Sequence, residues 1–210
     1  MHALASKRLS PILTLIVAAL VIAGCGKGDG PQSISNEPAA TLPPIPPGFC
    51  DAINFETLCE QPGIENFNGG ATIVIDNPDI SPGNGSEKVA QMQKFADEVF
   101  GGTKLNLSEA IDFSQGEFYK VNVWSPRPVP VAFKLEETGN PGGGLTVEVD
   151  HPGGSTWQQL CFDFRGQAVP PPVVALTIIF DLGVLGQAAA DPDNWTFFYD
   201  DIEQVSSCEG

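Results

Sequence analysis

Three acidic residues near the two ends of the chain are the first candidates for a chemical role. Asp200 and Asp201 are adjacent in 195–202, a segment that otherwise alternates large apolar residues, and Glu56 follows an aromatic residue in the short apolar segment 53–57. Side chains alternate along a strand, so the two aspartates point to opposite faces. Carboxylates that converge without a basic partner favour a hard, oxygen-liganded cation, and calcium fits best. The alternative is a solvated acidic edge that discourages the addition of further strands.

The spacing of the cysteines supports a pairing of these two segments. First and last strands commonly pair in antiparallel sandwiches, and a register with Glu56 opposite Asp201 places Cys50 almost opposite Cys208. A disulfide between these two cysteines would join the ends of the domain, and the other two would form the second pair. Four cysteines allow three connectivities, and the alternative of Cys50 with Cys59 closes only a short loop. The cysteines considered are Cys50, Cys59, Cys161 and Cys208.

The first 24 residues have the composition of a bacterial export signal. Lys7 and Arg8 supply positive charge, and 11–23 is apolar but too short for a comfortable membrane span. The residues around Cys25, Val-Ile-Ala-Gly-Cys-Gly, are similar to the lipobox, in which the cysteine is diacylated and becomes the new N-terminus. The alternative is an ordinary secretory leader with a chance cysteine. We expect a leader over 1–24 and a lipid anchor at Cys25 in place of a spanning helix.

The segment that follows, 25–48, is rich in Gly, Ser and Pro and ends in a proline-rich run. Such a composition predicts a semi-rigid tether that lifts a domain off the membrane. Gly26 after the cysteine resembles lipoproteins sent on to the outer membrane. We therefore expect the protein in the cell envelope, at the outer membrane or the cell surface.

The charge balance excludes one class of partner. The whole chain carries 26 acidic and ten basic residues, and loss of the leader with Lys7 and Arg8 takes the formal charge from -16 to -18. A nucleic-acid partner needs a basic surface, so we expect none. We expect a monomer in which residues 49–210 form one domain with a core of its own.

Short runs of Val, Ile, Phe and Thr alternate with Gly and Pro over this domain. The pattern predicts an all-β fold, an antiparallel β-sandwich. Helical periodicity is nearly absent, and 87–100, which has some, is equally compatible with a strand. The predicted strands are 71–75, 117–124, 129–135, 145–149, 158–164, 173–180 and 195–202.

In this order the segments resemble the jelly-roll, galactose-binding-like carbohydrate-binding modules attached to bacterial glycoside hydrolases, especially β-glucanases. The residues that carry the resemblance are 53–56, 66–71, 76–78 with Asn84, Ser86, Lys88 and Val89, 121–126, 133–136, 157–160 with 162–164, and 199–202. The resemblance implies a jelly roll that binds a polysaccharide, and a structural calcium held by Glu56 with Asp200 or Asp201. The chain departs from the family in its four extra cysteines and in lacking an attached catalytic domain.

Alternation along the strands predicts which side chains a glycan would meet. Apolar residues of one parity form the core, so those of the other parity share an outer face. Trp124 offers an aromatic platform for a sugar ring, and amide and charged groups beside it can bind hydroxyls. The alternative is an ordinary solvated sheet face. The candidate glycan-binding residues are Lys120, Asn122, Trp124, Lys134, Glu136, Gln159 and Asp163.

Catalysis has little support in the sequence. His151 is the only histidine after the leader, it precedes Pro-Gly-Gly, and no nucleophile motif accompanies it, so we expect a turn residue. Glu148 and Asp150 begin a paired-carboxylate pattern of retaining β-glucanases, but Gly153 stands where the third acid is needed. The sequence therefore predicts a lipid-anchored, non-catalytic polysaccharide-binding protein. The alternative is a structural or adhesion module of the envelope that binds no sugar.

Overall fold

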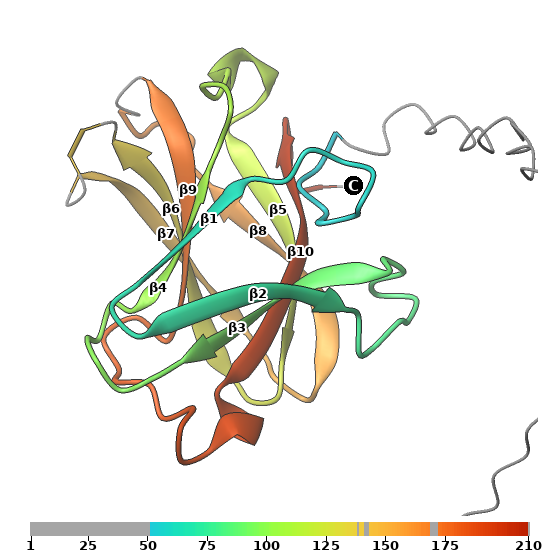
Figure 1. The fold of residues 1–210 in the computed structure, drawn as a ribbon. Coiled ribbons are helices and arrows are strands. Elements are labelled where there is room, and N and C mark those ends of the chain that lie inside the picture. The colour runs from blue at the N-terminus through green and yellow to red at the C-terminus, as the bar shows by residue number, and fades with distance from the viewer. Residues whose placement is uncertain (1–50, 138, 141–142, 169–171, 210) are drawn as a thin grey trace, which may run out of the picture. The chain divides into compact units, whose positions relative to one another are not determined.

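The computed structural model describes residues 51–137, 139–140, 143–168 and 172–209, and these form a β-sandwich of the jelly-roll class (Figure 1). Two short 3-10 turns, η1 (Phe113–Gln115) and η2 (Pro192–Asn194), are the only helical elements of these ranges. The strands are β1 (Gly63–Phe67), β2 (Gly70–Asp76), β3 (Lys88–Lys94), β4 (Gly102–Asn106), β5 (Phe118–Ser125), β6 (Val129–Glu137), β7 (Gly144–His151), β8 (Thr156–Asp163), β9 (Val173–Phe180) and β10 (Thr196–Val205).

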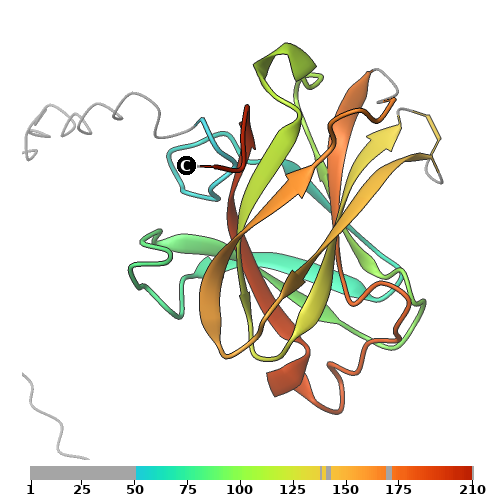
Figure 2. The same ribbon diagram turned by 180° about the vertical axis from the view of Figure 1, so that it is seen from behind.

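The strands form two five-stranded antiparallel sheets. One, called here the β9 sheet after its central strand, has the order β1-β4-β9-β6-β7. The other, the β10 sheet, has the order β2-β3-β10-β5-β8. In both views the loop between β9 and β10 lies at the end of the sandwich away from the C-terminus (Figure 1, Figure 2).

Apolar side chains of one parity fill the space between the sheets. Phe133 of the β9 sheet stacks on Tyr119 and Phe162 of the β10 sheet, with ring centroids 5.2 and 5.1 Å apart. Phe180 and Phe197 stack at 4.3 Å and join the two central strands. Each of the seven predicted strands is present, and 87–100 contains β3. The predicted all-β sandwich is confirmed, while β1 and β4 were not predicted.

The predicted pairing of the first and last segments is reduced to one bridge. Ile53 and Ile202 exchange two backbone hydrogen bonds of 2.9 and 3.0 Å, so the register differs by two residues from Glu56 opposite Asp201. The chain cannot continue the ladder because Phe55 has a φ of 55° and Asp201 a φ of 48°. These left-handed residues bend both segments, which turns the expected strand at 53–57 into a loop.

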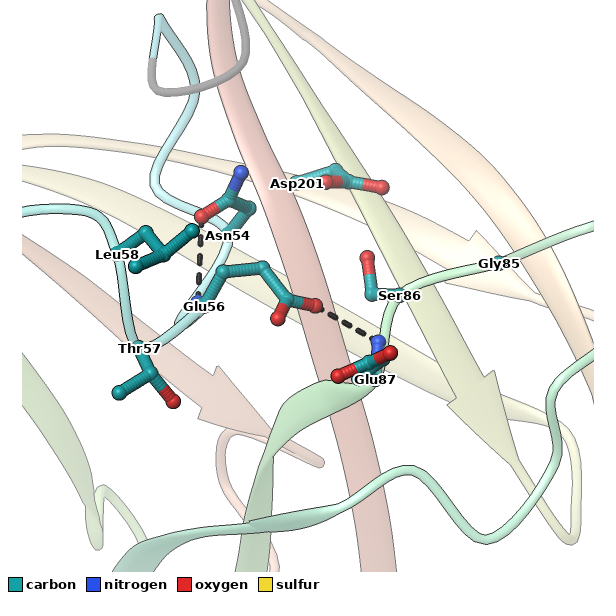
Figure 3. Close-up of a pocket in the computed structure, with 8 residues that line it drawn as sticks. All are labelled: Asn54, Glu56, Thr57, Leu58, Gly85, Ser86, Glu87 and Asp201. Carbon is teal, nitrogen blue, oxygen red and sulfur yellow. Dashed lines mark hydrogen bonds between the residues drawn. The ribbon is translucent and has the colours of Figure 1, made fainter. Parts of the chain in front are cut away.

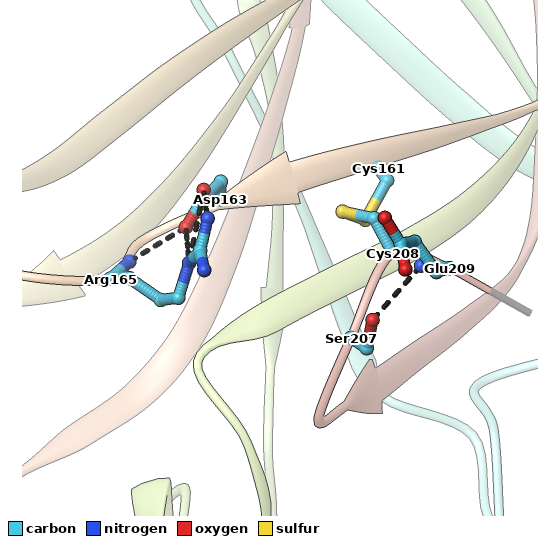
Figure 4. The surroundings of a disulfide bond; sticks show 6 residues. All are labelled: Cys161, Asp163, Arg165, Ser207, Cys208 and Glu209. Carbon is cyan, nitrogen blue, oxygen red and sulfur yellow. Dashed lines mark hydrogen bonds and ion pairs between the residues drawn. A yellow bond between two sulfur atoms is a disulfide. The ribbon is translucent and has the colours of Figure 1, made fainter.

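The structure contradicts the predicted disulfides. Cys161 of β8 is bonded to Cys208, with the Cα atoms 5.8 Å apart (Figure 4). Cys59 is disulfide-bonded as well, so neither Cys50–Cys208 nor Cys59–Cys161 is correct. The reason is topological: β5 separates β8 from β10, and the chain turns after β10 and returns toward β8.

No helix in the described part of the chain is long and apolar enough to cross a membrane. The predicted leader 1–24, the tether 25–48, the lipidation site Cys25 and Cys50 lie outside the described residues.

Candidate functional site

A groove of about 800 Å³ crosses the outer face of the β9 sheet. All five strands of the sheet contribute to it, because residues of one parity on each strand point outward in register. One row of partners runs from β1 to β7 as Glu65, Lys104, Thr177, Lys134 and Thr146. The floor of the groove is therefore polar along its whole width.

Four of the charged groups that line the groove form two ion pairs. Lys104 Nζ lies 2.6 Å from Glu65 Oε2, and Lys134 Nζ lies 3.0 Å from Glu136 Oε2. The Thr177 hydroxyl donates a 2.6 Å hydrogen bond to Glu136 Oε1. The groove thus presents fixed donors and acceptors with little local charge, which is the chemistry that recognises hydroxyl groups.

The other part of the groove is apolar. Phe67, Phe100, Ile179 and Leu182 line it, and Phe100 is 43% exposed. An exposed aromatic ring next to fixed polar groups provides a surface for the less polar face of a sugar ring. The groove combines the two kinds of contact that a glycan needs.

A second pocket, of about 670 Å³, contains two of the three predicted metal ligands (Figure 3). Glu56 and Asp201 line it together with Asn54, Ser86 and Glu87, and none of its described lining residues is basic. Glu56 Oε1 accepts hydrogen bonds from the backbone N–H groups of Glu87 (2.7 Å) and Lys88 (3.2 Å). The opening segment and the start of β3 are therefore joined through one carboxylate.

The third predicted ligand, Asp200, is fully buried and lies outside the lining of that pocket. Its Oδ2 accepts a 3.0 Å hydrogen bond from Asn84 Nδ2, whereas Oδ1 has no hydrogen-bond partner. Burial, and then the charge of Asp201, raises the pKa of Asp200 to about 7. Burial also raises the pKa of Asp201, and the charges of Glu56 and Glu203 add to that effect.

Asp201 thus interacts electrostatically with both Asp200 and Glu56. Within the described residues no group of three or more His, Cys, Asp or Glu side chains is arranged to hold a metal ion. The unpartnered buried oxygen of Asp200 and the two carboxylates that line the pocket are nevertheless oxygen donors, the ligand type that a hard cation takes.

The seven predicted glycan-binding residues do not share one face, contrary to the prediction. Lys134 and Glu136 belong to β6 and line the groove of the β9 sheet. The other five, Lys120, Asn122, Trp124, Gln159 and Asp163, belong to β5 and β8 of the β10 sheet. The reason is that the β5–β6 connection crosses from one sheet to the other, so equal parity places these residues on opposite outer faces.

Trp124 is not an open platform. Its ring lies 5.0 Å from that of Phe198, and its Nε1 donates a 3.1 Å hydrogen bond to Asp79 Oδ2. Trp157 Nε1 donates to the Asp79 backbone carbonyl at 2.8 Å, so Asp79 ties the loop between β2 and β3 to both tryptophans. Asn122 is buried and donates to Asp201 Oδ2 at 2.8 Å. These side chains serve packing and the acidic pocket.

Sequence reasoning missed several groove residues, above all Glu65, Lys104 and Phe100. The first two lie on the short strands β1 and β4, which carry too few apolar residues to show alternation. Phe100 lies in the loop before β4, beyond the end of β3 at Lys94, so the weak periodicity of 87–100 did not single it out. The available signal was compositional: an aromatic residue followed by Gly-Gly and a short polar strand.

His151 ends β7 and is buried, where a turn residue was expected. Its Nδ1 accepts a 2.9 Å hydrogen bond from the Gly153 N–H, so Nε2 is the protonated nitrogen and donates to the Val123 carbonyl at 3.1 Å. Burial lowers the pKa of His151. The ring connects the β7–β8 hairpin to β5, and its role is structural.

The sequence matches no protein-family model and no curated protein. In structure, the chain is similar to part of an exo-beta-agarase, with a TM-score of 0.54 and 10% identity over 74% of this chain and 25% of that enzyme. A family 11 carbohydrate-binding module of the cellulosomal cellulase Lic26A-Cel5E of Clostridium thermocellum has a TM-score of 0.49 and 12% sequence identity, and the match covers 76% of this chain and 95% of the module. A family 29 carbohydrate-binding module has a TM-score of 0.47 and 10% sequence identity, and the match covers 76% of this chain and 94% of the module. Carbohydrate-binding modules are thus among the structural neighbours, and at such identity the likeness shows the fold alone.

Proposed function

We propose that this protein is a non-catalytic polysaccharide-binding module that takes a glycan chain in the groove of the β9 sheet. The observation that carries the proposal is the groove itself, in which paired charges and a threonine hydroxyl lie beside the exposed ring of Phe100. Neutral β-glucan is the first ligand to test, because the groove has little net charge. A structural envelope module without sugar binding is the competing function.

Calorimetric titration tests the proposal. The protein is the leaderless chain with Cys25 replaced by serine, and the ligands are soluble mixed-linkage β-glucan, xylan and agarose oligosaccharides. Two lysines on opposite sheets provide a matched pair of variants. Lys134→Met should weaken binding about tenfold, or about 1.4 kcal/mol, because it removes a groove donor and leaves Glu136 without its cation. Lys120→Met should leave the affinity unchanged. The reverse result would place the site on the β10 sheet, and no binding of any glycan would favour the structural function.

We also propose that calcium binds at the pocket of Glu56 and Asp201, with Asp200 contributing its buried charge. The supporting observations are the unpartnered Asp200 oxygen and the raised pKa values of two carboxyls: burial and the charge of Asp201 raise the pKa of Asp200, and burial and the charge of Glu56 raise that of Asp201. When bound, a cation would neutralise these charges and stabilise the junction of the opening segment, β3 and β10.

The melting temperature measured with calcium and then with a chelator tests the calcium site. Calcium should raise it by several degrees, and Glu56→Gln should abolish most of that rise. Glu148→Gln, a change of an exposed acid on β7, is the matched control and should keep the full response. An equal response in all three proteins would mean that calcium acts on the general negative charge.

The location of the protein is a separate proposal. We propose that Cys25 is lipidated and that 26–48 tethers the domain to the envelope, at the outer membrane or the cell surface. The support is the lipobox-like sequence alone. Membrane association of the full chain that is lost in Cys25→Ser would agree with it, whereas unchanged fractionation of the variant would contradict it.

A further inference from the structure

Lys94, the last residue of β3, is a fully buried lysine whose ammonium is completely paired. Its Nζ donates to the backbone carbonyls of Val99 (2.9 Å), Phe180 (2.9 Å) and Asp181 (2.8 Å). Burying an ammonium is unfavourable unless its protons find acceptors, and here three protons meet three carbonyls. Burial lowers the pKa of Lys94 to about 8, so the group remains mostly charged at pH 7.

Two of these carbonyls precede residues that line the groove. Val99 is followed by Phe100, and Asp181 by Leu182, and both following side chains belong to the apolar end of the groove. The two loops also touch directly, because the Gly183 N–H donates to the Val99 carbonyl at 3.1 Å. One buried ammonium therefore joins the two loops that form this end of the groove.

The backbone of Lys94 adds to the same connection. Its carbonyl accepts a 2.9 Å hydrogen bond from the Ala188 N–H, in the β9–β10 loop. A Cβ atom at Gly186 would lie 2.2 Å from that carbonyl oxygen, so only glycine allows the loop to approach this closely. The loop is thus fixed to β3 at both the side chain and the main chain of one residue.

The side chains on the outer surface of these loops cannot hold their own positions by burial. Val99, Phe100, Val184 and Leu185 are between 38% and 48% exposed. A loop whose apolar side chains stay in water gains little packing energy, so its conformation must come from its backbone contacts. Lys94, which makes three of these contacts, is itself fully buried.

We propose that Lys94 is a positioning residue of the groove, which fixes Phe100 and Leu182 as the subsite that receives a sugar ring face. The inference rests on the proposed glycan function. Lys94 contacts no part of a ligand in this scheme. It acts through the backbone on either side of the groove end, and its loss would leave the polar floor of the groove in place.

A double-mutant cycle measures this role. Lys94→Met should weaken binding of mixed-linkage β-glucan about tenfold in the otherwise unchanged chain and less than about twofold in a Phe100→Ala background, because the two changes remove the same contact. Phe162→Leu, in the core facing away from the groove, is the control for general destabilisation and should bind normally. Lys94→Gln, which keeps part of the donor set, should give an intermediate affinity and serves if Lys94→Met does not fold.

Amide hydrogen exchange separates this inference from the proposed function. In Lys94→Met, or in Lys94→Gln if that variant alone folds, the amides of Gly183, Val184 and Ala188 should exchange at least about tenfold faster than in Phe162→Leu. This result supports the positioning role even if no glycan binds to the unchanged chain, which would refute only the proposed function. Unchanged exchange, or additive losses of affinity in the cycle, would overturn the role of Lys94.

Discussion

Trp124 connects β5 to the loop between β2 and β3 through Asp79. Its type and parity favoured a sugar platform, but its ring packs on Phe198 and its N–H is bound to Asp79. Aromatic residues with a polar edge serve equally to anchor a loop, and sequence does not distinguish an anchored ring from an open one. Phe100, which has no polar edge and lies in a loop, lines the groove and is 43% exposed.

A prediction at the residue scale follows from this packing. Trp124→Ala should lower the free energy of unfolding by about 2–4 kcal/mol, since it removes ring contacts and the hydrogen bond to Asp79, and should leave glycan affinity unchanged. Trp124→Phe keeps the ring and should lose only about 1 kcal/mol. Urea denaturation followed by calorimetric titration of the same samples checks both. Lost binding with intact stability would restore Trp124 as the platform.

At the scale of the elements, the sequence predicts the long strands well because their buried faces impose a period of two. It fails for β1 and β4, whose outward residues form the polar groove and whose length gives few repeats. It also fails for sheet membership. Parity says that Lys134 and Asn122 both face outward, but the sheet order that separates β6 from β5 depends on tertiary packing.

The acidic site illustrates the same limit for strand register. The sequence predicted that Glu56, Asp200 and Asp201 lie together, and the structure shows Asp201 interacting electrostatically with each of the other two. The two-residue difference in register accompanies the left-handed conformations of Phe55 and Asp201, which are uncommon for a bulky residue such as phenylalanine and which the sequence does not announce. The wrong cysteine partners have a different origin, because the chain turns after β10 and carries Cys208 back to Cys161 of β8 (Figure 4).

For the whole molecule, the net charge is strongly negative, whereas the groove itself carries little net charge. The chain without its leader carries a formal charge of -18, whereas the groove holds Glu65 with Lys104 and Glu136 with Lys134 as ion pairs. A neutral glycan meets these ion pairs and the carboxylate of Glu137, which accepts a hydrogen bond from Asn140. An anionic chain must approach through the field of the whole protein, which repels it.

Salt should have little effect on the binding of a neutral glycan. Affinity for mixed-linkage β-glucan should change less than about twofold between about 50 and about 500 mM sodium chloride, because the ligand carries no charge whose interaction with the protein salt could screen. Polygalacturonate, an anionic chain of similar backbone length, should not bind at low salt when calcium is absent, since screening is then weakest and repulsion strongest. Calorimetric titrations of both polysaccharides with one protein sample make the comparison direct.

Tight binding of polygalacturonate without calcium would mean that a basic surface dominates recognition. A large loss of β-glucan affinity with salt would mean that the ion pairs of the groove open to bind the ligand, in which case Lys104 and Lys134 act as free cations in the complex.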